Sequence, residues 1–184
     1  MKVIVFLAPG FEEVEAFTVV DYLRRINSIQ VDMVAIGDSL MVSGSHQIAV
    51  KADYHIDELL NLDAYEAVVI PGGMPGAANL RDDPRVIKIV RDMDAAGKLV
   101  AAICAGPIVL AKAKLVSGKK VTSYPGYEPD LGDSIYQEDA VVRDGNLITS
   151  RGPGTAVDFA LELVSVLAGA KEAETLRKKI LYNK

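Results

Sequence analysis

The chain has 184 residues, half of them hydrophobic, and a formal net charge of −5. A chain of this length and composition can bury a substantial core without disulfides, so we expect residues 1–184 to form a single domain. The negative charge and the lack of a Lys/Arg run provide no nucleic-acid-binding signature. The single cysteine excludes an internal disulfide and a cysteine-cluster metal site, and it is typical of a reducing compartment.

The sequence contains no segment of the length that a signal peptide or a membrane span requires. Residues 3–8 are apolar, but the core of a signal peptide needs roughly 7–15 apolar residues. The longest apolar stretch, residues 99–111, is interrupted by Gly106 and Pro107 and is shorter than the roughly 20 residues of a membrane span. We therefore expect a cytoplasmic protein that does not bind membranes.

Strand-like and helix-like segments alternate along the chain. Continuous apolar runs are typical of strands that are covered on both faces, whereas apolar residues at helical spacing predict helices. In chain order, the pattern predicts a strand at 3–7, a helix at 12–26, a strand at 31–36, a hairpin at 41–50, a strand at 67–70, a helix at 84–96, a strand at 99–103, a helix from about 105, strands at 140–143 and 147–150, and helices at 153–167 and 171–181. Repeated strand–helix units predict a mostly parallel sheet with helices on both faces.

Three loops with unusual residues follow three of the predicted strands. Residues 10–15 follow the first strand, residues 71–73 (PGG) follow the strand at 67–70, and Cys104 follows the next one. Ligands of such folds bind at the carboxyl ends of the parallel strands. We therefore expect the three loops to meet at one rim of the sheet.

Cys104 lies where the buried strand at 99–103 turns directly into a helix. The small residues Ala102, Ala105 and Gly106 allow a tight backbone turn, which is the requirement of a nucleophile elbow. N–H groups at the start of the helix would favour a thiolate and could stabilise an oxyanion. The alternative is that Cys104 is a small buried hydrophobic residue, the commonest fate of a free cysteine.

Glu12, Glu13 and Glu15 form an acidic run at the start of the first predicted helix. Carboxylates are favourable in the first turn of any helix, so the run requires no further role. Alternatively, one of them faces Cys104, and a protonated glutamate there could donate a hydrogen bond to the sulfur and later act as a general base. Helical periodicity does not select the residue, because Glu12 lies in line with the apolar face and Glu15 lies at its edge.

Two glycine-containing corners and two histidines complete the candidate residues. The glycines of segment 71–73 either form only a tight turn or allow a backbone N–H to approach the nucleophile, and residues 151–154 (RGPG) have the same two interpretations. His46 lies in the predicted hairpin, and His55 precedes a short helical segment. We expect both histidines to lie away from the rim and from the acidic run, so the sequence supports neither a Cys–His dyad nor a metal site.

Four segments together resemble the ThiJ/PfpI superfamily, in the branch that includes the parkinsonism-associated protein deglycase. They are residues 7–15 (LAPGFEEVE), 69–73 (VIPGG), 101–107 (AAICAGP) and 149–155 (TSRGPGT). They occur in the family order and span nearly the whole chain. The resemblance implies a flavodoxin-like three-layer sandwich of the class I glutamine amidotransferase-like type, usually assembled as a homodimer.

The resemblance also implies roles for residues of these segments. Cys104 would be the nucleophile or an oxidation-sensitive thiol, with Glu15 as its protonated partner. The backbone N–H groups of Gly73 and Ala105 would form the oxyanion hole. The supporting residues would be Gly72, Gly106 and Arg151.

The function that the resemblance implies is chemistry on small carbonyl compounds. We expect a cysteine-dependent enzyme that acts on α-oxoaldehydes or their early amine adducts, as a glutathione-independent glyoxalase or protein deglycase in stress defence. We expect no cofactor, because the chain has no dinucleotide-binding fingerprint. The alternative is a redox sensor or holdase chaperone that uses oxidation of Cys104. A cysteine peptidase is disfavoured, because Tyr124 occupies the place where many relatives carry a histidine near the cysteine.

Overall fold

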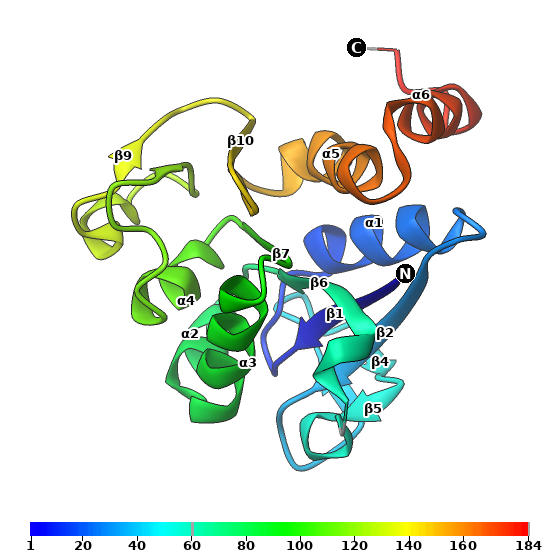
Figure 1. Ribbon diagram of the computed structural model, residues 1–184. Coiled ribbons are helices and arrows are strands. Elements are labelled where there is room, and N and C mark those ends of the chain that lie inside the picture. Colours follow the sequence, from blue (N-terminus) through cyan, green and yellow to red (C-terminus); the bar gives the residue numbers. More distant parts are fainter. Residues whose placement is uncertain (60, 184) are drawn as a thin grey trace.

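The structure is a computed structural model that describes residues 1–59 and 61–183 (Figure 1). Within these residues, a central sheet has seven strands. Their order is β10 (Val141–Asp144), β11 (Leu147–Ser150), β7 (Leu99–Ile103), β6 (Tyr65–Ile70), β1 (Lys2–Leu7), β2 (Gln30–Ala35) and β5 (Tyr54–His55). All neighbouring pairs are parallel except β10 and β11. The predicted mostly parallel sheet is therefore confirmed.

Helices cover both faces of this sheet (Figure 1). On one face lie α1 (Glu13–Arg24) and α5 (Ala156–Ala168), with α6 (Ala170–Lys179) packed against α5. On the other face lie α2 (Gly76–Asp82), α3 (Pro84–Ala95) and α4 (Pro107–Lys112). In the part of the chain that the structure describes, no helix has the length and apolar content needed to cross a membrane. The predicted three-layer α/β architecture is confirmed.

Alternating side chains of the buried strands divide the core in two. In β1, Val3, Val5 and Leu7 join the core beneath α1 and α5, whereas Ile4 and Phe6 join the core beneath α2, α3 and α4. All five side chains are fully buried. Successive strand residues point to opposite faces, so a strand that is covered on both faces must be apolar at every position.

Several short elements were not predicted from the sequence. They have too few residues to show a period, which is the signal on which the predictions rest. They are α2, β5, the two-stranded parallel sheet of β8 (Lys120–Val121) and β9 (Ile135–Tyr136), and the 3-10 helices Leu62–Ala64 and Glu128–Leu131. The short helical segment expected after His55 is present as the 3-10 helix Ile56–Glu58. The predicted hairpin at 41–50 is present as β3 (Met41–Ser43) and β4 (Ala49–Lys51), which pair antiparallel.

Two helices begin later than predicted. The helix expected from about 105 begins at Pro107, because the backbone at Cys104 adopts a left-handed conformation that cannot belong to a helix. Proline is favourable at the first helical position, where its missing N–H leaves no bond unmade. The helix expected from 153 begins at Ala156, after the 3-10 turn Pro153–Thr155.

The parallel register aligns the carboxyl ends of β1, β6 and β7. Val5 pairs with Val69, and Val69 pairs in turn with Ala101, so the loops that follow these strands are neighbours. The Glu12 N–H donates to the Gly72 carbonyl oxygen at 3.0 Å and links the first loop to the second. The predicted meeting of three loops at one rim is confirmed.

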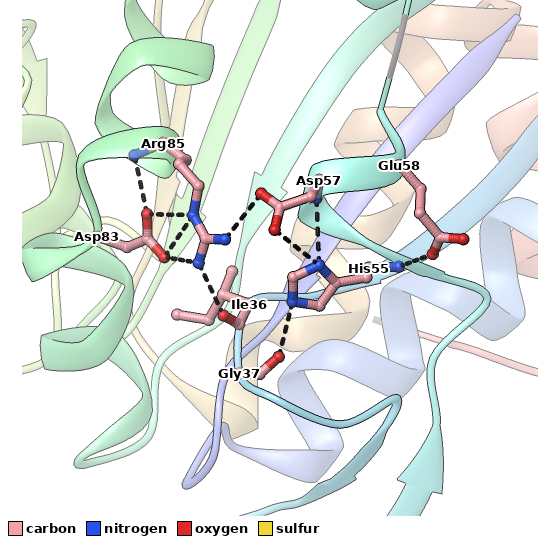
Figure 2. Close-up of polar contacts among 7 residues, drawn as sticks. All are labelled: Ile36, Gly37, His55, Asp57, Glu58, Asp83 and Arg85. Carbon is pink, nitrogen blue, oxygen red and sulfur yellow. Dashed lines mark hydrogen bonds and ion pairs between the residues drawn. The ribbon is translucent and has the colours of Figure 1, made fainter.

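A polar network fixes the edge of the sheet next to β5 (Figure 2). Nε2 of His55 donates a hydrogen bond to the carbonyl oxygen of Gly37 at 2.8 Å, which ties the edge to the loop after β2. Arg85 of α3 donates to Asp57 at 2.9 Å and also binds Asp83. A very short edge strand flanked by charged side chains offers little template for pairing with another sheet.

We expect Gly106→Ala to lower the free energy of unfolding by about 1–3 kcal/mol, the usual cost of overpacking a filled site. The backbone of Gly106 (φ −51°) suits any residue, but an added Cβ would lie 2.6 Å from the carbonyl oxygen of Ile70. Gly154→Ala is the matched control, because nothing lies within 4 Å of a Cβ there. Denaturant unfolding of both variants measures the difference, and equal stabilities would contradict the close packing at Gly106.

Candidate active site

Cys104 occupies a strained turn between β7 and α4. Its φ of +63° lies in the left-handed region, which is uncommon for a residue with a side chain and is concentrated at functional sites. The Cys104 N–H donates to the Ser150 carbonyl oxygen, and the Cys104 carbonyl oxygen accepts from the Tyr124 N–H, both at 2.9 Å. The residue is half-buried. The turn therefore holds Cys104 at the rim rather than enclosed in the core.

Glu15 is the carboxyl group that the fold places against Cys104. It lies in the first turn of α1 and is fully buried. Its carboxyl group is hydrogen-bonded to the Cys104 side chain, and its Oε2 accepts the Gly72 N–H at 2.8 Å. Oε1 is buried and accepts no N–H among the described residues. The structure thus selects Glu15 from the acidic run, a choice that helical periodicity left open.

Burial and mutual repulsion hold protons on both members of this pair. Burial raises the pKa of Glu15 from its ordinary 4.5 to about 7, against the hydrogen bonds from Cys104 and Gly72. Burial, then the charge of Glu15, raises the pKa of Cys104 to about 12, against hydrogen bonds from the N–H groups of Ala105 and Gly73. The expected lowering of the thiol pKa by a helix start is wrong in direction, because burial of the sulfur and the neighbouring Glu15 carboxyl group raise this pKa and α4 starts only at Pro107.

Two backbone donors and two crowded glycines surround the sulfur. The N–H groups of Gly73 and Ala105, both named from the sequence, donate to the Cys104 side chain. A Cβ at Gly72 would lie 2.7 Å from both the Cys104 Cβ and the Glu15 Oε2, so only glycine fits there. Gly73 has a φ of +84°, which favours glycine for a second reason. These glycines let the backbone reach the thiol.

The other two carboxylates of the acidic run have structural partners. Glu12 is the N-cap of α1, and its Oε2 accepts the Glu15 N–H at 2.7 Å. Glu13 is buried against the β3–β4 turn, where Oε1 accepts the His46 N–H at 2.7 Å. Its Oε2 contacts His46 Nδ1 at 2.9 Å, and a Cβ at Gly44 would collide with this carboxylate. Glu12 and Glu13 therefore fix the start of the helix that carries Glu15.

The expectation that both histidines lie away from the acidic run is wrong for His46. The β3–β4 turn folds back onto α1, which long-range packing decides and local sequence does not show. Burial alone would raise the pKa of Glu13, but hydrogen bonds from His46 and backbone N–H groups lower it, and the same contact raises the pKa of His46. Ligand atoms of Glu12, Glu13 and His46 lie within 4.8 Å of one another, a spacing that could hold a metal ion. His55 belongs to the sheet edge (Figure 2).

Arg151 and Tyr124 lie beside the turn at Cys104, and the hydrogen bonds described for them do not involve the sulfur. The Arg151 guanidinium donates to the carbonyl oxygen of Glu138 at 2.9 Å. Tyr124 is 49% exposed, and its ring lies 3.2 Å from where a Cβ of Gly152 would be. Ser150, whose carbonyl oxygen anchors the Cys104 N–H, was not singled out from the sequence, although it lies in the TSRGPGT segment.

These features define an α/β protein that presents a cysteine on a tight strand-to-helix turn beside a buried carboxyl group. Residues 1–166 match the DJ-1/PfpI family. The chain belongs to this family, as the resemblance of its four segments predicted.

Known relatives match over nearly the whole chain. Protein dj-1beta of Drosophila melanogaster is 40% identical over 184 residues, covering 98% of this chain and 97% of that protein. The Parkinson disease protein 7 homolog of Danio rerio is 36% identical, covering 98% of this chain and 96% of that protein. The structure of oxidized Toxoplasma gondii DJ-1 has a TM-score of 0.93 at 35% identity, covering 100% of this chain and 99% of that one.

We expect Glu15→Gln to remove a pH dependence of stability between pH 4.5 and 7. The folded state raises the pKa of Glu15 from 4.5 to about 7, so the folded protein binds this proton more tightly and loses stability as the pH rises through this window. The loss is about 3 kcal/mol, at 1.36 kcal/mol for each pKa unit. Urea unfolding at pH 5 and pH 8 measures it.

The control for this titration is Glu66→Gln, since Glu66 is exposed on β6. Its free energy of unfolding should follow that of the wild type at both pH values. A Glu15→Gln variant whose stability also follows the wild type at both values would contradict a buried, proton-retaining Glu15.

Proposed function

We propose that the protein is a cysteine-dependent enzyme that converts small α-oxoaldehydes such as methylglyoxal, or their early adducts with amines, into hydroxy acids without glutathione or a cofactor. The observation that supports this most strongly is the contact between the half-buried Cys104 thiol and the buried Glu15 carboxyl group, beside two backbone N–H donors. The arrangement supplies a nucleophile, a proton carrier and an oxyanion site around one position.

The reactive form of the pair carries one proton and one negative charge. Between the pKa of Glu15 at about 7 and the pKa of Cys104 at about 12, the pair holds a single proton, which lies mainly on the thiol; the reactive form is the minor tautomer in which this proton has moved to Glu15. The N–H groups of Gly73 and Ala105 favour a negative charge on the sulfur. Glu15 Oε1 accepts no N–H among the described residues, so this oxygen has no donor that would stabilise the ionised carboxylate. We therefore assign the proton to Glu15 when the sulfur attacks.

The sulfur then bonds to the aldehyde carbon, and the oxygen of that carbon takes the proton from Glu15 to give a hemithioacetal. The Glu15 carboxylate moves the C–H proton of this carbon to the adjacent carbon, while the hydroxyl proton passes to the other oxygen. The aldehyde carbon is thereby oxidised to a thioester and the ketone carbon reduced to an alcohol, so no external oxidant is needed. Water cleaves the C–S bond, which releases the hydroxy acid and restores the thiol.

Cys104→Ser should lower methylglyoxal consumption in the absence of glutathione by about a thousand-fold or more, because a hydroxyl beside a carboxyl group is too weakly activated to attack. Circular dichroism and urea unfolding should show that the variant remains folded. The exposed-site variant Glu66→Gln should keep the wild-type rate. A Cys104→Ser rate within a few-fold of the wild type would remove Cys104 from the mechanism.

A redox sensor or holdase chaperone is the second candidate, because the same half-buried thiol and N–H donors could hold oxidised sulfur. A relative of the same fold has been solved as its oxidized form. Turnover separates the two functions: a sensor reacts once with an oxidant, whereas an enzyme consumes many aldehyde molecules for each thiol.

Mild peroxide should add two oxygens to the peptide that carries Cys104 before it oxidises a methionine, because the tautomer of the pair that carries the proton on Glu15 presents a thiolate to the oxidant. Met74 is the internal reference, because the residue is 49% exposed and a thioether has no ionised form that a neighbouring group could favour. Peptide mass spectrometry over a peroxide series measures the order. Oxidation of Met74 with Cys104 still reduced would argue against both candidate functions.

We also propose that the protein forms a homodimer, as the resemblance implies. Val14 and Ile48 are more than half exposed although both are large and apolar, and the Ile48 N–H contacts Glu13, the neighbour of Val14. We infer that both contribute to an apolar surface near the contact of α1 with the β3–β4 turn. Light scattering should report twice the mass of one chain, and Val14→Lys should shift it toward the monomer. A wild-type monomer at micromolar concentration would reject the dimer.

A further inference from the structure

Three side chains that can bind a metal ion meet where the start of α1 contacts the β3–β4 turn. Glu12 and Glu13 lie at the start of α1, and His46 lies in the turn. One ligand atom of each lies within 4.8 Å of the other two. Nδ1 of His46 lies 2.9 Å from Oε2 of Glu13 and 3.9 Å from Oε1 of Glu12. Ligand atoms at about 2.0–2.2 Å from one ion lie about 3–4 Å apart, so small side-chain movements would place all three around one ion.

The two carboxyl groups are buried next to each other without a permanent cation. The side chains of Glu12 and Glu13 are only 10% and 5% exposed. Among the described residues, no Lys or Arg forms an ion pair with either group, and their one ionisable partner is His46, whose side chain is 69% exposed. Buried carboxylates are usually paired with a cation or coordinate a metal. A solvent-exposed histidine, which is charged only when it is protonated, meets this need in part.

The start of α1 supplies too little positive charge to take the place of an ion. A helix start carries about half an elementary charge, which is less than the charge of two carboxylates. Oε2 of Glu12 accepts the Glu15 N–H at 2.7 Å. Oε1 of Glu12 accepts no hydrogen bond in the part of the chain that the structure describes, and its polar contact is with Nδ1 of His46 at 3.9 Å, beyond hydrogen-bond distance. This buried oxygen is therefore free to bind a cation beside His46.

The ligand atoms indicate the class of ion. One imidazole nitrogen with carboxylate oxygens suits divalent first-row transition metals such as Zn²⁺, whereas Mg²⁺ and Ca²⁺ take oxygen ligands. The hydroxyl of Ser45 lies 3.2 Å from Oε2 of Glu13 and 3.1 Å from Nδ1 of His46, so it can orient the bound carboxylate by a hydrogen bond.

We propose that Glu12, Glu13 and His46 bind a divalent transition-metal ion, for which Zn²⁺ is the probe, and that water completes its coordination. The ion replaces the hydrogen between Nδ1 of His46 and Oε2 of Glu13, and this proton is released to solvent. The bound ion links the start of α1 to a turn 33 residues further along the chain. Neither Cys104 nor Glu15 is a ligand, so the ion is additional to the proposed active site.

Isothermal titration calorimetry of the full chain with Zn²⁺ tests the site. The wild type should bind Zn²⁺, and Glu12→Gln and His46→Ala should each weaken binding at least about ten-fold, since even the partners of metal ligands contribute about 10–100-fold. Glu12→Gln keeps an oxygen that can accept the Glu15 N–H, so its lower affinity would not reflect a lost helix cap. Gln47→Ala is the matched control, because Gln47 is the exposed neighbour of His46 in the same turn, and it should keep the wild-type affinity.

Cys104→Ser separates this site from the thiol, which is a possible Zn²⁺ ligand itself. The variant should keep the affinity that Glu12→Gln and His46→Ala lose, and Zn²⁺ should raise the Tm of Cys104→Ser but not that of His46→Ala. A wild type that does not bind Zn²⁺ at millimolar concentration, wild-type affinity in Glu12→Gln or His46→Ala, or loss of all binding in Cys104→Ser would each overturn the proposal. None of these measurements involves methylglyoxal, so the metal site and the proposed function are tested independently.

Discussion

The contact between the buried Glu15 carboxyl group and the Cys104 thiol constrains everything around it. Two anions cannot both occupy this half-buried position, so the pair retains a proton, and the remaining charge must be met by donors that need no side chain. Backbone N–H groups reach the pair only because Gly72 has no Cβ, which would lie 2.7 Å from both members. The left-handed turn at Cys104 completes the arrangement, since it directs the side chain toward α1. The centre therefore depends on one retained proton and on the absence of a Cβ at Gly72.

The three carboxylates of the acidic run show how position in a fold separates identical side chains. Glu12 caps α1, Glu13 accepts hydrogen bonds from the β3–β4 turn, and Glu15 alone is directed at the thiol. The surroundings push their proton affinities apart: hydrogen bonds keep the pKa of Glu13 below its ordinary value, whereas burial raises that of Glu15. Groups whose environments separate their pKa values in this way are the usual basis of acid–base chemistry. The first two glutamates therefore fix the start of the helix so that the third faces Cys104.

The same centre is suited to both addition to carbonyl compounds and oxidation. Each needs an accessible sulfur with N–H donors beside it, and membership of the DJ-1/PfpI family is compatible with either. What distinguishes them chemically is a proton carrier that acts repeatedly. Glu15, in the first turn of α1, is the group proposed for this task.

Local pattern in the sequence determined the alternating elements, the parallel sheet and the position of Cys104 at a strand-to-helix turn, because side-chain periodicity and glycine or proline positions act over a few residues. It could not choose between Glu12 and Glu15, since a helical wheel contains no information on what faces a helix start. It also placed His46 away from the acidic run. Only the tertiary structure decided these points, because the β3–β4 turn and the loop after β6 approach the start of α1 through long-range packing. The pKa values of Glu15 and Cys104 also depend on the tertiary structure, because the burial and the charges that shift them arise from residues distant in the chain.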